Sequence, residues 1–223
     1  MHMSPRISGL VFDMDGTLVD NMHFHHKAWK EFLRRQGVSI TDEEFHRKNV
    51  GIITEIIPRF LPHAQEPDLI LQLGMEKEAV YRELYGPHIT PIAGLNDFLA
   101  SAYTAGIPIA LATAADQGNI QFTLEGLGMA HFFRAITGSE EVRRGKPDPD
   151  VYLISAAKLK VRPEDCIAFE DTPSGIQAAR SAGMQVVGIA STHTREELSQ
   201  YPLLTIIDDY QSLTLDVLTK LIP

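Results

Sequence analysis

The sequence has one cysteine, no long hydrophobic run and fewer basic than acidic residues. The single cysteine, Cys166, cannot form an internal disulfide, which is typical of a reducing compartment. It lies in the apolar run Asp165–Phe169, so we expect a buried, unreactive thiol. No segment has the length of a membrane span, and no signal-peptide core follows Met1. We therefore expect a cytoplasmic protein with no membrane partner.

The formal net charge of -9 comes from 20 Lys and Arg against 29 Asp and Glu. Such a charge disfavours nucleic acid as a partner, because binding to its backbone requires Lys and Arg near the phosphates. A small anion bound by a metal ion and a few local donors remains compatible with it. Repeats and low-complexity stretches are also missing, and a hydrophobic content of 44% suffices for a packed core. We expect a monomer or a weak homo-oligomer.

A strand pattern is missing from the whole stretch between Val19 and His88. The stretch instead shows helical periodicity over His23–Gln36, Thr54–Phe60 and Asp68–Tyr85. A capping-box pair, Thr41 and Glu44, indicates one more helix start. We therefore predict an all-helical cap domain over residues 19–89, inserted into a core domain made of residues 1–18 and 90–223.

From residue 90 onward the expected strands and helices alternate. The strands are expected at Ile107–Ala112, Arg134–Thr137, Cys166–Phe169, Val186–Ala190 and Leu204–Ile207. The helices are expected at Leu95–Ala105, Gln117–Leu127, Asp150–Leu159, Ser174–Ala182 and directly after Thr194. Strands separated by helices imply a parallel sheet with right-handed crossovers. The predicted fold is α/β, with a Rossmann-like sheet.

Acids, a lysine and a threonine follow the ends of the predicted strands. The first strand, within Gly9–Leu18, ends in two acids and a glycine, and later strands end in a threonine or an acid pair. These residues are Asp13, Asp15, Thr113, Glu170 and Asp171, and Lys146 lies in the loop Gly145–Pro149. A doubly wound sheet brings such residues to one edge. Carboxylates that stay ionised together favour Mg²⁺, which prefers oxygen ligands.

Phosphoryl transfer is the chemistry that this set of side chains fits. A metal ion and a lysine neutralise the charge of a phosphoryl group. On chemical grounds Asp13 is the candidate nucleophile, which would form an aspartyl-phosphate, and Asp15 the candidate acid and base. Singly, Thr113 is typical of a strand-end hydroxyl, Lys146 of a solvated lysine and Asp171 of a helix cap. Their joint occurrence after successive strands favours the catalytic interpretation.

The same residues resemble a known family. The haloacid dehalogenase superfamily has four motifs, which are similar to Asp13–Thr17, Thr113, Lys146 and Glu170–Asp171 in this order. The run Phe169–Ala179, followed by Ala182 and Gly183, resembles the β-phosphoglucomutase-like branch of that superfamily. The resemblance implies a Rossmann-like core with a helical cap, dependence on Mg²⁺ and phosphorylation of an aspartate.

The resemblance also implies roles for individual residues. It carries over Asp13, the backbone carbonyl of Asp15 and Asp171 as metal ligands, with Glu170 beside them as a further candidate. The transferring phosphoryl group would be held by Thr113, Ala114 and Lys146. In the β-phosphoglucomutase branch a His followed by a Trp begins the cap, and His25 and Trp29 match this pair. We expect His25 to contact the substrate or Asp15, and Trp29 to lie in the core of the cap.

Two departures from the mutase pattern bear on the substrate. The mutase has a Lys-Gly-x-x-Arg stretch in its cap, where this chain reads Val50–Thr54, and Ser-Lys-Asn where this chain reads Ala115–Gln117. These replacements remove positive charges that a bisphosphate requires and add Asp116. An alternative that stays open is that Arg47, Lys48 or Arg59 supplies the lost positive charge from a different position. We therefore predict a phosphatase acting on a small phosphorylated metabolite, with β-phosphoglucomutase as the alternative.

Other classes fit less well. A dehalogenase has no use for Asp15 or for a metal-binding acid pair, and a phosphonate hydrolase needs a cap lysine that forms a Schiff base, for which Lys48 is the nearby candidate. A signalling receiver module has its phosphorylated aspartate after a middle strand and has no helical insert. A non-catalytic relative kept for partner binding is a further alternative, but no expected motif residue is missing.

Overall fold

The computed structural model describes residues 7–49 and 53–222. The chain divides into two compact units. The first contains the described residues up to Asp20 and from Ile89 onward, and the second contains Asn21–His88. We describe each unit by itself.

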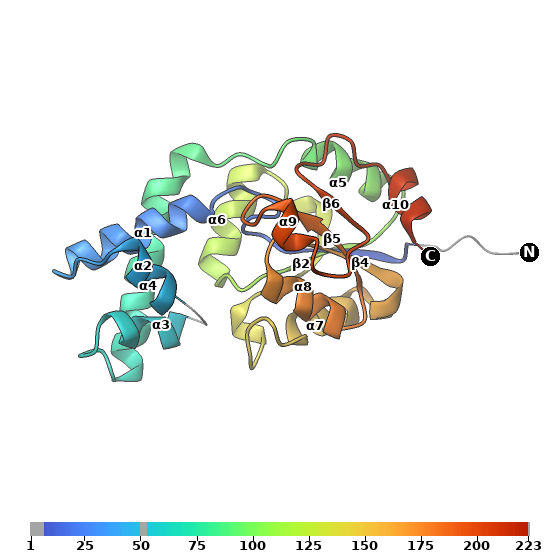
Figure 1. The fold of residues 1–223 in the computed structure, drawn as a ribbon. Helices are drawn as coiled ribbons and strands as arrows, with labels where there is room; N and C mark the ends of the chain where they lie inside the picture. Colours follow the sequence, from blue (N-terminus) through green and yellow to red (C-terminus); the bar gives the residue numbers. More distant parts are fainter. Residues whose placement is uncertain (1–6, 50–52, 223) are drawn as a thin grey trace, which may run out of the picture. The chain divides into compact units, whose positions relative to one another are not determined.

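The first unit is built on a six-stranded sheet in which every pairing is parallel (Figure 1). The strands are β1 (Gly9–Phe12), β2 (Ile109–Ala112), β3 (Phe133–Thr137), β4 (Cys166–Glu170), β5 (Gln185–Ile189) and β6 (Thr205–Ile207). Their order in space is β3-β2-β1-β4-β5-β6. The first strand is therefore central, and the direction of winding reverses between β1 and β4. This arrangement confirms the predicted α/β, Rossmann-like fold.

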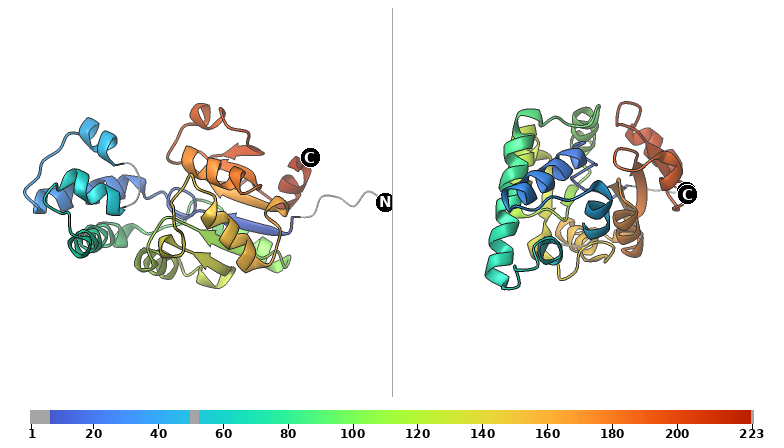
Figure 2. Two further views of the ribbon diagram at one scale, coloured as in Figure 1. Left: turned by 90° about the horizontal axis from the view of Figure 1, so that it is seen from below. Right: turned by 60° about the vertical axis from the view of Figure 1, so that its left-hand side comes forward.

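Helices cover both faces of the sheet. α5 (Leu95–Thr104) and α10 (Leu215–Leu221) lie on one face, and α7 (Asp150–Leu159) and α8 (Pro173–Ser181) lie on the other (Figures 1 and 2). The remaining helices of this unit are α6 (Gln117–Leu127), α9 (Arg195–Leu198) and the 3-10 turns η2 (Ala130–Phe132), η3 (Ser139–Glu141) and η4 (Pro163–Asp165). Helix α10 was not predicted. Thr214 caps it by accepting a hydrogen bond from the Val217 N–H at 3.2 Å.

Strand β1 is buried on both faces, which explains its uninterrupted apolar sequence. On one face Phe12 stacks on Phe169 of the neighbouring strand, with ring centroids 4.3 Å apart, and packs edge-on against Phe98 of α5. On the other face Val11 belongs to the cluster under α7 and α8, together with Ala110 and Ala168. Small residues at these positions allow the helices to approach the sheet closely.

The second unit is helical, and its described residues form no strand. Its helices are α1 (Met22–Arg35), α2 (Asp42–Lys48), α3 (Ile53–Phe60), α4 (Pro67–Tyr85) and the 3-10 turn η1 (Gly86–His88). Trp29 is only 4% exposed and packs against the rings of Phe32 and Phe60, so it lies in the core of this unit as expected. Thr41 caps α2 by accepting a hydrogen bond from the Glu44 N–H at 3.1 Å.

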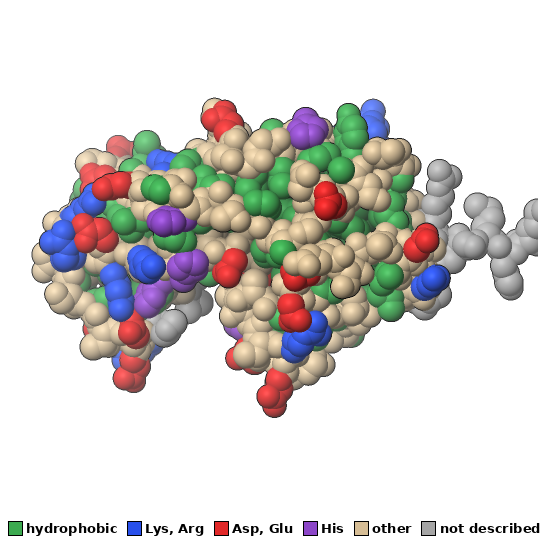
Figure 3. Space-filling model, turned by 90° about the horizontal axis from the view of Figure 1, so that it is seen from above, with side chains coloured by type: hydrophobic (Ala, Val, Ile, Leu, Met, Phe, Trp, Pro, Cys, Tyr) green, Lys and Arg blue, Asp and Glu red, His purple; other side chains and the backbone are tan. Residues whose placement is uncertain are grey.

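The described residues form no continuous basic patch on the face drawn in Figure 3 and no helix that could span a membrane. On the face drawn in Figure 3, the Lys and Arg side chains of the described residues are interspersed with acidic ones and form no continuous basic patch. None of the described helices combines the length and the apolar character that crossing a bilayer requires. Cys166 is a buried free cysteine, as predicted.

The central position of β1 makes its side chains sensitive to truncation. Leu10 of β1 is fully buried, whereas Leu153 of α7 is 40% exposed. We expect Leu10→Ala to lower the free energy of unfolding by about 2–5 kcal/mol, because it leaves a cavity in a packed core. The matched change Leu153→Ala should stay within about 0.5 kcal/mol. Urea unfolding followed by circular dichroism measures both values. Equal losses in the two variants would contradict this account of the core.

Candidate active site

The predicted site residues follow strands that are neighbours in the sheet. Asp13 comes directly after β1, and its N–H continues the pairing with β4 by donating to the Phe169 carbonyl at 3.1 Å. Glu170 is the last residue of β4, the strand that pairs with β1. Thr113 follows β2, and its N–H donates to the Thr137 carbonyl of β3 at 3.0 Å. The carboxyl ends of β2, β1 and β4 therefore present these side chains at one edge, where the winding reverses.

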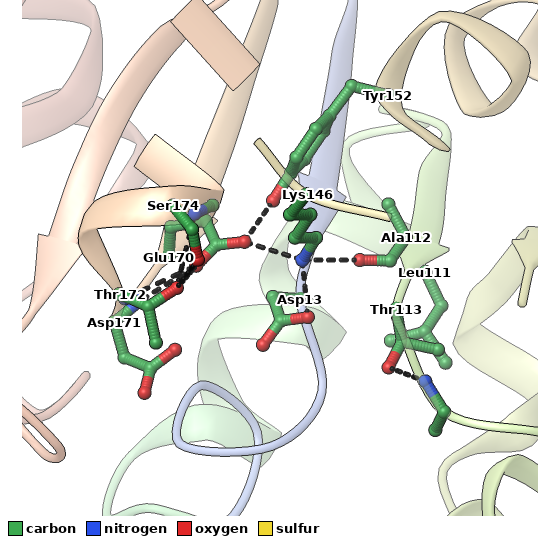
Figure 4. A network of polar contacts seen from close by, with 12 residues as sticks. Asp13, Leu111, Ala112, Thr113, Lys146, Tyr152, Glu170, Asp171, Thr172 and Ser174 are labelled. Atoms are coloured by element: carbon green, nitrogen blue, oxygen red, sulfur yellow. Dashed lines mark hydrogen bonds and ion pairs between the residues drawn. The ribbon is translucent and has the colours of Figure 1, made fainter. Parts of the chain in front are cut away.

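Lys146 joins the ends of three strands. Its ammonium donates to Asp13 Oδ1 at 2.7 Å, to Glu170 Oε1 at 2.5 Å and to the Ala112 carbonyl at 3.1 Å (Figure 4). The side chain is 9% exposed. Each of its three N–H groups therefore has an acceptor, in a place that water hardly reaches. The structure brings Asp13, Lys146 and Glu170 together as the sequence predicted.

Negative charge exceeds positive charge in this buried group. Ligand oxygens of Asp13, Glu170 and Asp171 lie within 4.8 Å of one another, and all three residues are buried. Burial raises the pKa of Asp13 to about 7, although the charge of Lys146 opposes the rise. Burial also favours loss of the Lys146 proton, but the carboxylates of Asp13 and Glu170 outweigh it and raise the pKa of Lys146. Lys146 thus stays charged, and one ammonium faces three carboxyl groups.

The two acids at the end of β4 differ in their partners. Both oxygens of Glu170 accept hydrogen bonds: Oε1 from Lys146 and Tyr152, and Oε2 from the N–H groups of Asp171 and Thr172 and from the Thr172 hydroxyl. Asp171 is fully buried, yet within the described chain neither of its oxygens has a partner in hydrogen-bond geometry. A buried carboxylate without a donor is costly unless a cation meets it. The chemistry of this cluster therefore fits a divalent cation with oxygen ligands.

The backbone of the loop after β1 lies directly against Asp171. Gly16 has φ of +78°, and a Cβ added there would lie 2.0 Å from Asp171 Oδ2 and 2.7 Å from Thr192 Oγ1. Only glycine permits both this conformation and this approach. Burial, and then the charges of Glu170 and Asp13, raise the pKa of Asp171, and the nearby Thr192 hydroxyl opposes the rise. Ser191 further fixes the loop by donating to the Gly16 carbonyl.

Three other predicted residues lie at the same edge of the first unit. Asp15 is half-buried, and its charge contributes to the raised pKa of Asp13. Thr113 is 1% exposed, and its hydroxyl oxygen accepts from the Ala115 N–H at 3.0 Å, which leaves the hydroxyl proton available. Ala114 follows Thr113 and is exposed. In the view of Figure 4, Asp13 lies between Thr113 on one side and Asp171 on the other.

This geometry coincides with a family match over most of the chain. Residues 10–189 match the family model described as haloacid dehalogenase-like hydrolase. The chain belongs to the haloacid dehalogenase-like hydrolase family. The matched range includes the loop after β1, Thr113, Lys146 and the acid pair that ends β4, together with the helical unit.

Relatives within this family act on phosphorylated sugars. Fructose-1-phosphate phosphatase YqaB of Escherichia coli (strain K12) is 32% identical over 188 residues, which cover 84% of this chain and 98% of that protein. Beta-phosphoglucomutase of Bacillus subtilis (strain 168) is 28% identical over 193 residues, covering 82% of this chain and 83% of that protein. Among solved structures, the HAD hydrolase, family IA, variant 3 from Entamoeba histolytica HM-1:IMSS superposes with a TM-score of 0.88 at 31% identity, and covers 96% of this chain and 98% of its own.

His25 belongs to the helical unit of this haloacid dehalogenase-like chain. Its ring stacks on Tyr81, with centroids 3.8 Å apart, and its Nδ1 lies 3.2 Å from Lys77 Nζ. Lys77 is only 3% exposed, forms an ion pair with Glu78 at 2.8 Å and lies over the ring of Trp29. Contact of His25 with the substrate or with Asp15 stays a prediction, and its polar partner observed within this unit is Lys77.

Several residues of the site were not predicted. Tyr152 and Thr192 contact or adjoin the acid pair, and Lys77 is the buried partner of His25. Tyr152 and Lys77 lie in helical segments, where an aromatic residue indicates core and a lysine indicates solvent. A resemblance to the family motifs gives no signal for them, because they lie outside those motifs. The sequence offered one hint for Tyr152: it follows Lys146 by a distance shorter than two helical turns, close enough to lie near the same site.

Close packing of Glu170 against α8 gives a test of the site's rigidity. A Cβ at Gly175 would lie 1.9 Å from Glu170 Oε1, so Gly175→Ala forces the buried carboxylate to shift. We expect a loss of about 1–3 kcal/mol in the free energy of unfolding, as for other overpacked cores. Gly74→Ala on α4 is the control, because its Cβ would meet Ile53 at an ordinary 3.4 Å. Helix propensity should make that variant up to about 1 kcal/mol more stable. Urea unfolding measures the free energies of both variants. A Gly175→Ala variant that is more stable than wild type would contradict the close packing of Gly175 against Glu170.

Proposed function

We propose that the chain is a Mg²⁺-dependent phosphatase that hydrolyses a small, sugar-phosphate-like metabolite through an aspartyl-phosphate intermediate. One observation carries this proposal: Lys146 holds the carboxylate of Asp13 at 2.7 Å, beside the partnerless carboxylate of Asp171. This arrangement supports the roles proposed here: Asp13 as nucleophile, Lys146 as the phosphoryl-binding cation and Asp171 as a metal ligand. The activity of the fructose-1-phosphate phosphatase relative supports the substrate class.

The proposed reaction has two displacement steps. In the first, an Asp13 oxygen attacks phosphorus and the P–O bond to the sugar breaks, while Asp15 gives a proton to the leaving alcohol oxygen. In the second, Asp15 takes a proton from water, and the water oxygen attacks the same phosphorus. Asp13 then leaves as a free carboxylate, and inorganic phosphate is released. Lys146, the Thr113 hydroxyl and the backbone at Ala114 hold the phosphoryl oxygens, in agreement with the proton that Thr113 retains.

The metal ion in this proposal is held by Asp13, Asp171 and the backbone carbonyl of Asp15, with Glu170 next to them. A bound Mg²⁺ would neutralise the carboxylates and the phosphoryl charge. The oxygens of Asp171 support this assignment most strongly, because neither has a partner in hydrogen-bond geometry among the described residues. Glu170, whose oxygens already accept from five groups, would hold Lys146 and order the acid pair.

A phosphatase is favoured over a mutase by the partners of Lys48 and Arg59, two of the three candidate cations, and by the role of Asp116. Lys48 pairs with Glu44 at 2.9 Å and Arg59 with Glu55 at 3.6 Å, each on its own helix. Asp116 accepts from the Asn119 N–H at 2.8 Å and caps α6, so this acid has a structural role where the mutase has a lysine. Where the mutase has its Lys-Gly-x-x-Arg stretch, this chain has residues 50–54, and residues 50–52 lie outside the described residues. Mutase activity stays the alternative, because a β-phosphoglucomutase is among the relatives of this chain.

We further propose that the helical unit is the cap that selects the substrate, over residues 19–89 with a core of residues 1–18 and 90–223. The observed compact unit, Asn21–His88, supports this division. A cytoplasmic location, a monomer or weak homo-oligomer, and the absence of a nucleic-acid or membrane partner belong to the same proposal. The buried free thiol of Cys166 and the net charge of -9 support it.

The proposed function is tested by supplying the purified protein with Mg²⁺ and a panel of sugar phosphates, nucleotides and pyrophosphate. We expect steady release of inorganic phosphate from at least one sugar phosphate. A coupled assay for glucose 6-phosphate, with β-glucose 1-phosphate and a bisphosphate primer, tests the mutase. Isomerisation without phosphate release would overturn the phosphatase proposal. A stable phosphoprotein without turnover would indicate a signalling module instead.

The nucleophile is tested by Asp13→Asn, with Asp97→Asn as a matched control on the exposed surface of α5. We expect Asp13→Asn to lower kcat by at least about a thousandfold, because an amide does not form the acyl phosphate. The protein should also lose the phosphoryl group that acid quenching and mass spectrometry detect on wild-type protein. Asp97→Asn should keep full activity. Substantial turnover by Asp13→Asn would remove Asp13 from the nucleophile role.

A further inference from the structure

Tyr152 contacts both members of the buried ion pair at the centre of the site. It lies on α7, is fully buried, and donates its hydroxyl proton to Glu170 Oε1 at 2.6 Å (Figure 4). The same oxygen accepts from Lys146 at 2.5 Å. The Lys146 ammonium also lies over the ring of Tyr152, 5.1 Å from its centroid. Two donors, a phenol and an ammonium, therefore share one carboxylate oxygen.

No N–H group of Lys146 is free to donate to a phosphoryl group. Its three N–H groups are taken by Asp13, Glu170 and the Ala112 carbonyl. If Lys146 holds a phosphoryl oxygen, as the proposed function requires, one of these contacts is released. Glu170 is fully buried, so water cannot replace a lost donor there. Without another donor, releasing Glu170 would leave a buried carboxylate oxygen unpaired, which is strongly unfavourable.

The other side of Glu170 is fixed. Its Oε2 accepts from the backbone of Asp171 and from the N–H and hydroxyl of Thr172. Gly175 packs so closely that a Cβ there would overlap the carboxyl group. Glu170 therefore cannot turn to follow Lys146, and Tyr152 is the remaining donor to Oε1 among the described residues.

We propose that Tyr152 is a positioning residue whose hydroxyl keeps Glu170 Oε1 hydrogen-bonded while Lys146 turns an N–H from Glu170 to a phosphoryl oxygen. This proposal rests on the proposed function of the same site. Burial raises the pKa of Tyr152 well above its usual value, so the phenol keeps the proton that it donates. The cation–π contact with the Tyr152 ring stabilises the ammonium both when Lys146 donates to Glu170 and when it donates to a phosphoryl oxygen.

Tyr152→Phe tests the proposal, because it removes the hydroxyl and keeps the ring. The probe is inorganic phosphate, titrated calorimetrically into the full-length protein with saturating Mg²⁺. We expect the Kd for phosphate to rise about tenfold or more, the scale of a lost hydrogen bond to a charged group. Ser155→Ala is the matched control on the same helix, where a buried hydroxyl donates to Thr137 Oγ1 at 2.9 Å. Its Kd should stay within about twofold of wild type.

A double-mutant cycle with Glu170→Gln separates positioning from a general packing effect. If Tyr152 acts through the charge of Glu170, Tyr152→Phe should change the Kd by less than about twofold in the Glu170→Gln background. An unchanged Kd in Tyr152→Phe alone, or an equal loss in both backgrounds, would overturn the role of Tyr152. Wild-type protein that binds no phosphate would instead overturn the proposed function itself, so the two failures are distinguishable.

A second variant covers the case in which Tyr152→Phe does not fold. Tyr152→3,5-difluorotyrosine keeps the ring and the hydroxyl and makes the phenol a stronger donor. We expect this substitution to tighten phosphate binding, because Glu170 then releases Lys146 more readily. A Kd equal to that of wild type would overturn the proposal.

Discussion

The interaction on which the site depends is the buried ion pair between Lys146 and the carboxylates of Asp13 and Glu170. One ammonium is insufficient for the acids gathered there, and neither side-chain oxygen of Asp171 has a partner in hydrogen-bond geometry among the described residues. Burial, with the charges of Glu170 and Asp15 adding to it, raises the pKa of Asp13 to about 7, although the charge of Lys146 opposes the rise. The group is therefore incomplete without further positive charge, and that need connects the fold to phosphoryl chemistry.

The sheet topology produces this group from distant parts of the sequence. Because β1 is central and pairs with β2 and β4, the residues after the three strands meet without any long loop. Lys146 reaches them from the segment before α7, and this helix brings Tyr152 into contact with Glu170. Glycines at positions 16 and 175 allow the backbone to approach Asp171 and Glu170. Backbone packing thus fixes the positions of the acids before any ligand binds.

The sequence predicted the sheet, most helices and the meeting of Asp13, Lys146 and Glu170, because strand ends and motif order carry that information. It did not predict α10, since the short pattern after Thr214 resembles a tail. It also did not predict Tyr152 or Lys77. A buried tyrosine that bonds an acid has the same apolar helical spacing as an ordinary core residue, and a lysine on a helix is usually solvated. The partners of these side chains come from long-range contacts, which a local pattern does not contain.

The most direct test of the central claim is calorimetric titration of Mg²⁺ into metal-free protein at about pH 7, in buffers of different ionisation enthalpy. Because burial raises the pKa of Asp13 to about 7, Asp13 is partly protonated at this pH before the metal binds, and burial shifts the pKa of Asp171 in the same direction. The account predicts one bound ion, release of protons on binding, and loss of binding in Asp171→Asn. Binding without proton release, or undiminished binding by Asp171→Asn, would contradict it.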